Sequence, residues 1–122
     1  MSEESARDRA GDVAQALHAL ANLLGHDTAR RLCALYQSRM PEIMKALEAA
    51  SASGDAQALR RAAHDLVTNA GTMGFMRLAA EARAAEESAA RGDAAAAQSR
   101  VPALLAAIAA SFPVVDAWIQ VA

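Results

Sequence analysis

Hydrophobic residues recur at spacings of three and four along most of the chain, which predicts amphipathic helices and no sheet. The first stripe predicts a helix over residues 9–24 that ends at Gly25, because glycine suits the position after a helix. Its apolar positions are Val13, Leu17, Leu20 and Leu24. Residues 1–8 are polar and acidic, so we expect a flexible, solvated tail there.

A second stripe predicts a helix that is capped by Asp27 or Thr28 and runs to about residue 52. Pro41 falls inside it, and an interior proline removes a backbone hydrogen bond. We therefore expect either a bend over residues 37–40 or two shorter helices, the second beginning at Pro41. The apolar positions are Leu32, Leu35, Tyr36, Met40, Ile43, Met44 and Leu47.

The third predicted helix follows a turn over residues 51–54 and is capped by Asp55. Wound at about 100° per residue, it separates into two faces. The apolar face holds Leu59, Ala62, Ala63, Leu66, Ala70 and Met73. The other face holds Gln57, Arg60, Arg61, His64, Thr68 and Gly71. The imidazole of His64 should therefore point to water, with small residues one and two turns further on.

Two glycines within residues 71–74 end this helix, and a fourth begins near Phe75 and ends near residue 90. Its inward positions are Phe75, Leu78, Ala79, Ala82 and Ala85. After a turn, Asp93 caps a last helix that contains Pro102, and Pro113 is expected to set apart a terminal turn or two over residues 114–121. The apolar side of this last helix holds Leu104, Leu105, Ile108, Phe112, Val115, Trp118 and Ile119.

Four long helices joined by short turns can bury their stripes only against one another. We therefore expect an all-α fold, an antiparallel up-and-down four-helix bundle whose end is covered by an additional short N-terminal helix. The chain has 122 residues, enough for one hydrophobic core, so residues 9–122 should form a single domain.

Composition and charge argue against several classes of function. The net charge of −2 disfavours nucleic-acid binding, which needs a basic surface. No uncharged apolar run reaches the roughly 18 residues of a membrane span, and the polar N-terminus predicts no secretory signal. The single cysteine, Cys33, cannot form an internal disulfide and is expected to be a small buried hydrophobe, which suits the reducing cytoplasm.

A set of spaced positions runs through the third and fourth helices: His64-Asp65-Leu66, Gly71, Gly74, Leu78 and Glu86. They resemble the motif of the histidine-containing phosphotransfer (HPt) domains of bacterial two-component phosphorelays. That motif reads H-x-L-K-G, then small residues, G-x-x-x-L and a closing acid. The family's lysine and adjoining glycine are Val67 and Thr68 here, and Ala85 replaces the leucine before the acid.

The resemblance implies that His64 accepts a phosphoryl group and passes it on. Neutral imidazole is well populated near pH 7 and has a lone pair for attack on phosphorus. The partners it implies are a response-regulator receiver domain, a hybrid histidine kinase, or both, with the metal ion and the aspartate on the receiver. We expect a phosphoryl carrier and no enzyme with its own ATP site. We also expect a monomer with no cofactor or metal.

Arg60 and Arg61, one turn before His64, could partly replace the missing lysine, or could simply keep the helix soluble. Thr68 and Gly71 would give a docking receiver close access to the ring. Val67 could instead belong to an apolar docking patch.

The remaining histidines, His18 and His26, have no ligand-spaced partners for zinc. The methionines Met40, Met44, Met73 and Met76 are expected to fill the core.

Two other functions remain open at this point. The first is a non-phosphorylated adaptor of the same shape that binds or sequesters a receiver or a kinase. The second is a purely structural bundle, which a buried His64 would favour.

Overall fold

The computed structural model describes residues 3–121, and within this range the chain is all α-helical, with five helices and no strand. This confirms the predicted all-α class. The helices are α1 Glu3–Leu24, α2 His26–Ser53, α3 Ala56–Thr72, α4 Met76–Ala90 and α5 Ala94–Val121. Each connection between them is short, as helices that pack against their neighbours require.

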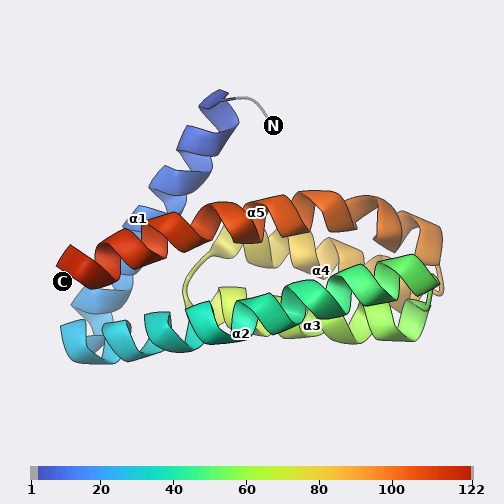
Figure 1. The fold of residues 1–122 in the computed structure, drawn as a ribbon, viewed down its shortest axis with the longest axis horizontal. Helices are drawn as coiled ribbons and strands as arrows, with labels where there is room; N and C mark the ends of the chain where they lie inside the picture. The colour runs from blue at the N-terminus through green and yellow to red at the C-terminus, as the bar shows by residue number, and fades with distance from the viewer. Residues whose placement is uncertain (1–2, 122) are drawn as a thin grey trace.

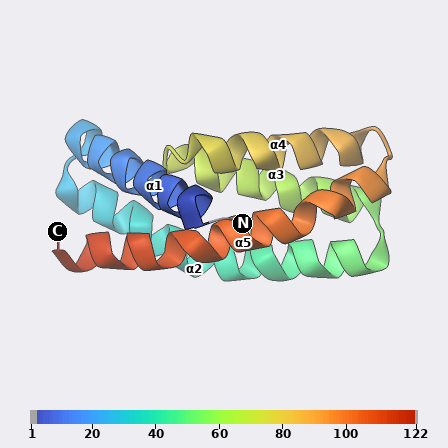
Figure 2. The same ribbon diagram turned by 90° about the horizontal axis from the view of Figure 1, so that it is seen from above.

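The helices α2, α3, α4 and α5 lie side by side with their long axes roughly aligned, as two views at right angles agree (Figures 1 and 2). α3 contacts α2 and α4, and α5 contacts the same two helices from the other side. α1 packs against α5 and α2 near one end, and its first turns project beyond the other helices (Figure 1).

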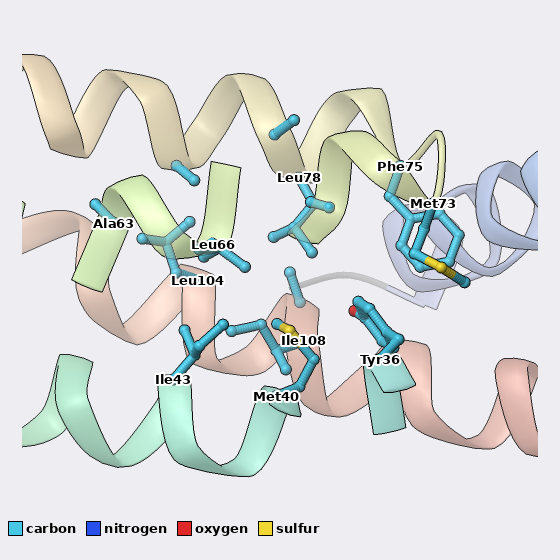
Figure 3. Packing of buried hydrophobic residues seen from close by; sticks show 14 of the residues in the cluster. Tyr36, Met40, Ile43, Ala63, Leu66, Met73, Phe75, Leu78, Leu104 and Ile108 are labelled. Atoms are coloured by element: carbon cyan, nitrogen blue, oxygen red, sulfur yellow. The ribbon is translucent and has the colours of Figure 1, made fainter. Parts of the chain in front are cut away.

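The core is built from the predicted stripes. Every residue predicted on the apolar face of α3 is buried, and every residue predicted on its polar face is exposed. Figure 3 shows the middle of the core, where Leu66, Leu104 and Ile108 meet. At one end of it the Tyr36 ring packs edge-on against Phe75, with the ring centroids 5.3 Å apart. Three side chains predicted to face inward are instead exposed: Leu24, Leu35 and Met76.

The first helix ends before Gly25 as predicted, and two of the three predicted N-terminal side-chain caps are present. An Asp55 carboxylate oxygen accepts hydrogen bonds from the backbone N–H groups of Gln57 and Ala58, at 3.0 and 3.2 Å. Asp93 accepts one from the N–H of Ala96 at 3.1 Å. The predicted cap at Asp27 or Thr28 is wrong, because α2 already begins at His26. Gly25, with φ of 88°, makes the turn there and forms no side-chain cap.

Pro102 lies within α5 as predicted, but the breaks predicted at Pro41 and Pro113 are wrong. α2 continues through Pro41 and α5 continues through Pro102 and Pro113, so neither the division at Pro41 nor the separate segment after Pro113 occurs. All three prolines are exposed. Their rings therefore take no space in the core, while buried neighbours such as Met40 hold the helix against it.

The first helix is longer than predicted. Residues 3–8, predicted as part of a tail, form the first turns of α1, and residues 1 and 2 lie outside the described range. With 22 residues, α1 is not short. The carboxylates of Glu3 and Glu4 lie in the first turn of α1, where they interact favourably with the positive end of the helix dipole. Arg9 links α1 to α4 through an ion pair with Glu81.

α5 is long and apolar enough to span a membrane by length and composition alone, which the prediction from uncharged runs did not anticipate. Among the described residues it is the one helix of this kind. Leu104, Ile108 and Val115 of the same helix are buried against its neighbours, so its apolar character also has a packing reason.

Candidate functional site at His64

His64 lies midway along α3 on its solvent-facing side. Its side chain is 62% exposed, as the periodicity predicts. The apolar face of α3 is anchored in the core by Leu59, Leu66 and Ala70. This anchoring fixes the rotation of the helix, so the outward direction of the ring is a property of the fold.

A carboxylate from the next helix holds the ring. Nδ1 of His64 and Oε2 of Glu86 are 2.6 Å apart, and the Glu86 side chain is only 20% exposed. An ionised carboxylate can only accept a hydrogen bond, so Nδ1 must be the donor. In a neutral imidazole with its proton on Nδ1, the lone pair is on Nε2. The pair therefore fixes both the orientation and the tautomer of an exposed ring.

The turn between α3 and α4 brings these two residues together. Gly74 adopts φ of 78°, and the N–H of Phe75 donates to the carbonyl of Ala70 at 2.9 Å. The chain then reverses, with buried Phe75 as its anchor. His64 and Glu86 lie equally far from Phe75 along the chain, which places them opposite each other in an antiparallel helix pair. Buried alanines let the two helices approach closely: Ala63, Ala70, Ala79 and Ala82.

On the C-terminal side of His64, small residues leave the backbone of α3 with little side-chain cover. The Thr68 hydroxyl donates to the backbone carbonyl of His64 at 3.2 Å, which keeps this side chain against its own helix. Gly71 is exposed, and a Cβ added to it would meet nothing within 4 Å. Internal packing therefore does not require glycine at this position.

The two arginines before His64 are exposed, and within residues 3–121 neither Arg60 nor Arg61 forms an ion pair or a hydrogen bond. Val67, at the position of the family's lysine, is half-buried and packs against the core. The structure thus places Arg60, Arg61, Thr68 and Gly71 on the same exposed side of α3 as His64.

The contact between Glu86 and His64 is the feature that the sequence reasoning missed. The sequence marks Glu86 only as the closing acid of the motif, and a second glutamate, Glu87, adjoins it. The available signal was the equal separation of His64 and Glu86 from the turn. That signal becomes usable only when the centre of the turn is known to lie at Phe75.

The surroundings of the other candidate residues explain their presence without a functional role. Cys33 is fully buried, as predicted, and burial raises the pKa of its thiol. His26 is exposed and stacks on Trp118 with the ring centroids 5.9 Å apart. Met40 and Met73 fill the core as predicted, whereas Met76 does not. Among residues 3–121 no three His, Cys, Asp or Glu side chains are grouped closely enough to hold a metal ion.

A cleft of about 460 Å³ lies away from His64, between α1, α4 and α5. Its walls include Val13, Ala16, Phe75 and Leu78, with Arg9 and Asp12 at the α1 side. Neither His64 nor any of its charged neighbours contributes to it. The candidate site is therefore an open surface, which suits a macromolecular partner better than a small ligand.

The site defines an all-helical protein with an exposed imidazole that is held by a carboxylate. Comparison with protein families identifies it further, because the model of the Hpt domain family matches residues 31–111, a stretch that contains both His64 and Glu86. This chain belongs to the Hpt domain family. Neither the curated proteins nor the solved structures that were compared give a match. Hpt domains act as phosphocarriers in two-component systems and interact with receiver domains and histidine kinases.

Proposed function

We propose that this chain relays phosphoryl groups between aspartates of response-regulator receiver domains, and that His64 is the phosphorylated residue. One observation carries the proposal: Glu86 holds Nδ1 of an exposed imidazole at 2.6 Å, and Nε2 is left as the free nucleophile.

The chemistry follows from this geometry. The Nε2 lone pair of His64 attacks the phosphorus of an aspartyl phosphate on the receiver. The new N–P bond forms as the P–O bond to the aspartate breaks, and the carboxylate leaves with that electron pair. The proton stays on Nδ1, and the positive charge that develops on the ring faces the Glu86 carboxylate. The reverse step delivers the group to a second aspartate. The receiver supplies the metal ion and the in-line alignment.

The same proposal assigns roles to the scaffold. The helices α2–α5 form an antiparallel up-and-down four-helix bundle that α1 covers at one end, and the five helices act as one domain. Arg60 and Arg61 contribute positive charge beside the ring, and Thr68 and Gly71 allow a receiver to approach closely. The protein works as a cytoplasmic monomer without a cofactor and contains no ATP site, so it carries the group and does not generate it.

The test is transfer from a phosphorylated receiver encoded by the same genome. We expect the chain to acquire an alkali-stable, acid-labile label, and His64→Gln to abolish it. The matched control is His18→Gln, because His18 is exposed on α1 and should leave labelling unchanged. A label that survives in His64→Gln would show that the carrier residue is elsewhere.

The alternative is an adaptor that binds a receiver or a kinase without being phosphorylated. The apolar Val67 in place of the family's lysine favours it. In that case the receiver would bind the wild-type chain and His64→Gln equally well, and neither would take label. The purely structural alternative lacks its expected sign, a buried His64, because this side chain is 62% exposed.

A further inference from the structure

We propose that Arg83, on α4, is the cation that neutralises the phosphoryl group while His64 carries it. This inference rests on the proposed function, and it assigns a role to a residue outside the motif. Arg83 would act on the phosphoryl oxygens directly through charge-assisted hydrogen bonds, for which guanidinium is well suited.

The site needs such a cation for an electrostatic reason. A phosphoryl group on Nε2 carries a charge of about −1.5 to −2, and the ring, still protonated on Nδ1, offsets only one unit of it. The Glu86 carboxylate lies 2.6 Å from the other ring nitrogen, so two anionic groups would flank one imidazole. The next position of α3 along this side, Val67, is apolar and half-buried, and so provides no charge.

The pairing of α3 with α4 identifies the candidate. The contact between His64 and Glu86 sets the register of these antiparallel helices. Arg83 precedes Glu86 by three residues, and Val67 follows His64 by three, so Arg83 lies across from Val67. Positions three apart share one side of a helix, which places Arg83 on the same side of α4 as Glu86. The offset from His64 along the helix axis is about 4.5 Å, within the reach of an arginine from a helix packed about 8–10 Å away.

Arg83 is also free to take this role. Its side chain is exposed and has no ion pair or hydrogen bond among the described residues. The other arginines of this segment are engaged: Arg77 pairs with Asp12 at 3.3 Å, and Arg91 donates to the Ser88 hydroxyl at 3.5 Å. The side chain of Arg60 is also unpaired. Arg60 lies one turn before His64 on α3, whereas Arg83 lies level with the turn after it, so the two arginines would flank the phosphoryl group.

The experiment separates contact with the phosphoryl group from a general effect of surface charge. The chain is phosphorylated with phosphoramidate, without any partner protein. Nε2 of His64 attacks phosphorus, the N–P bond to His64 forms, the P–N bond of phosphoramidate breaks, and ammonia leaves. The readouts are the initial rate of labelling and the second phosphoryl pKa, followed by phosphorus NMR. The variants are Arg83→Ala, Arg83→Gln and Arg83→Lys, and the matched control is Arg100→Ala, an exposed arginine on α5.

We expect Arg83→Ala and Arg83→Gln to slow labelling about 5-fold and to raise the phosphoryl pKa by about 0.5, because a nearby cation favours the dianion. Arg83→Lys should retain part of both effects, and Arg100→Ala should behave as wild type. Thermal unfolding should be unchanged in all variants, since these side chains are exposed.

Three results would overturn the inference, and they are distinguishable. In the first result, His64 is labelled, and Arg83→Ala and Arg100→Ala show the same labelling rate and the same phosphoryl pKa. This would reject the role of Arg83 and leave the carrier function intact. Slower transfer from a receiver with unchanged phosphoramidate labelling makes Arg83 a docking residue, contrary to the proposal. A wild-type chain that takes no label at His64 removes the carrier function and this inference with it.

Discussion

At the scale of single residues, the site depends on one hydrogen bond. An exposed imidazole would ordinarily sample several orientations and both neutral tautomers, and Glu86 selects one of each through its 2.6 Å contact with Nδ1. Because the Glu86 side chain is mostly buried between the helices, it has little freedom to move away. Partial burial of the carboxylate thus orders a ring that is itself open to solvent.

Replacing Glu86 tests this directly. We expect Glu86→Gln to slow phosphoryl transfer to His64 by about 10-fold, because an amide neither fixes the tautomer nor stabilises the positive charge that develops on the ring. The matched control is Glu87→Gln, which makes the same change at the adjoining, exposed position. Initial transfer rates from a phosphorylated receiver provide the measurement. Equal rates for the two variants would mean that the contact does not contribute to transfer.

At the scale of elements, α3 combines a fixed apolar face with a low outer surface. Its N-terminus is held by Asp55, its inner face is fully buried, and its outer face carries the ring with Thr68 and Gly71 beyond it. Glycine inside a helix normally costs stability relative to alanine. Nothing packs over Gly71, so the reason that we propose for a small residue there is the approach of a partner.

A larger residue at position 71 should therefore increase the stability of the fold and weaken receiver binding. Gly71→Gln should raise the free energy of unfolding by about 0.5 kcal/mol through helix propensity, and should weaken binding to the receiver several-fold through steric conflict. Gly11→Gln is the control, because Gly11 is also exposed, helical and free of neighbours within 4 Å, but lies on α1. Urea denaturation and receiver titrations provide the two measurements. Unchanged receiver affinity in Gly71→Gln would exclude this surface from docking.

At the scale of the whole molecule, the core fixes the positions of α3 and α4. The buried ring of Tyr36 on α2 packs against Phe75 in the turn between them, and its hydroxyl lies 2.8 Å from the hydroxyl of Ser111 on α5. The Ser111 hydroxyl also lies 2.6 Å from the carbonyl of Ile108, to which it donates. The Tyr36 hydroxyl therefore donates to Ser111, and this buried polar link is satisfied at both ends.

Burial raises the pKa of Tyr36 to about 12 from its usual value near 10. A group whose pKa is raised in the folded state stabilises the fold fully below the unfolded pKa, and that contribution is lost as pH rises through the folded pKa. The free energy of unfolding should therefore fall between about pH 10 and pH 12, by about 2–3 kcal/mol from Tyr36.

The comparison with Tyr36→Phe isolates this contribution, because the Cys33 thiol, whose pKa is also raised by burial, is present in both proteins. We expect the variant to lose about 1 kcal/mol at pH 7 with its hydrogen bond, and to show a shallower decline above pH 10. Since Tyr36 is the single tyrosine, phenolate absorbance reports its titration directly. Parallel declines for the two proteins would contradict the assignment.

The pattern of residues by itself determined the five helices, the buried and exposed faces of α3, the caps at Asp55 and Asp93, and the outward direction of His64. These features follow from local periodicity and from side-chain chemistry within one turn. The tertiary structure alone decided that Glu86 meets the His64 ring, that α2 and α5 continue through their prolines, and that α1 extends to Glu3. Each of those outcomes depends on contacts between segments far apart in sequence or on which side of a helix faces water, and local periodicity carries no information about helix register.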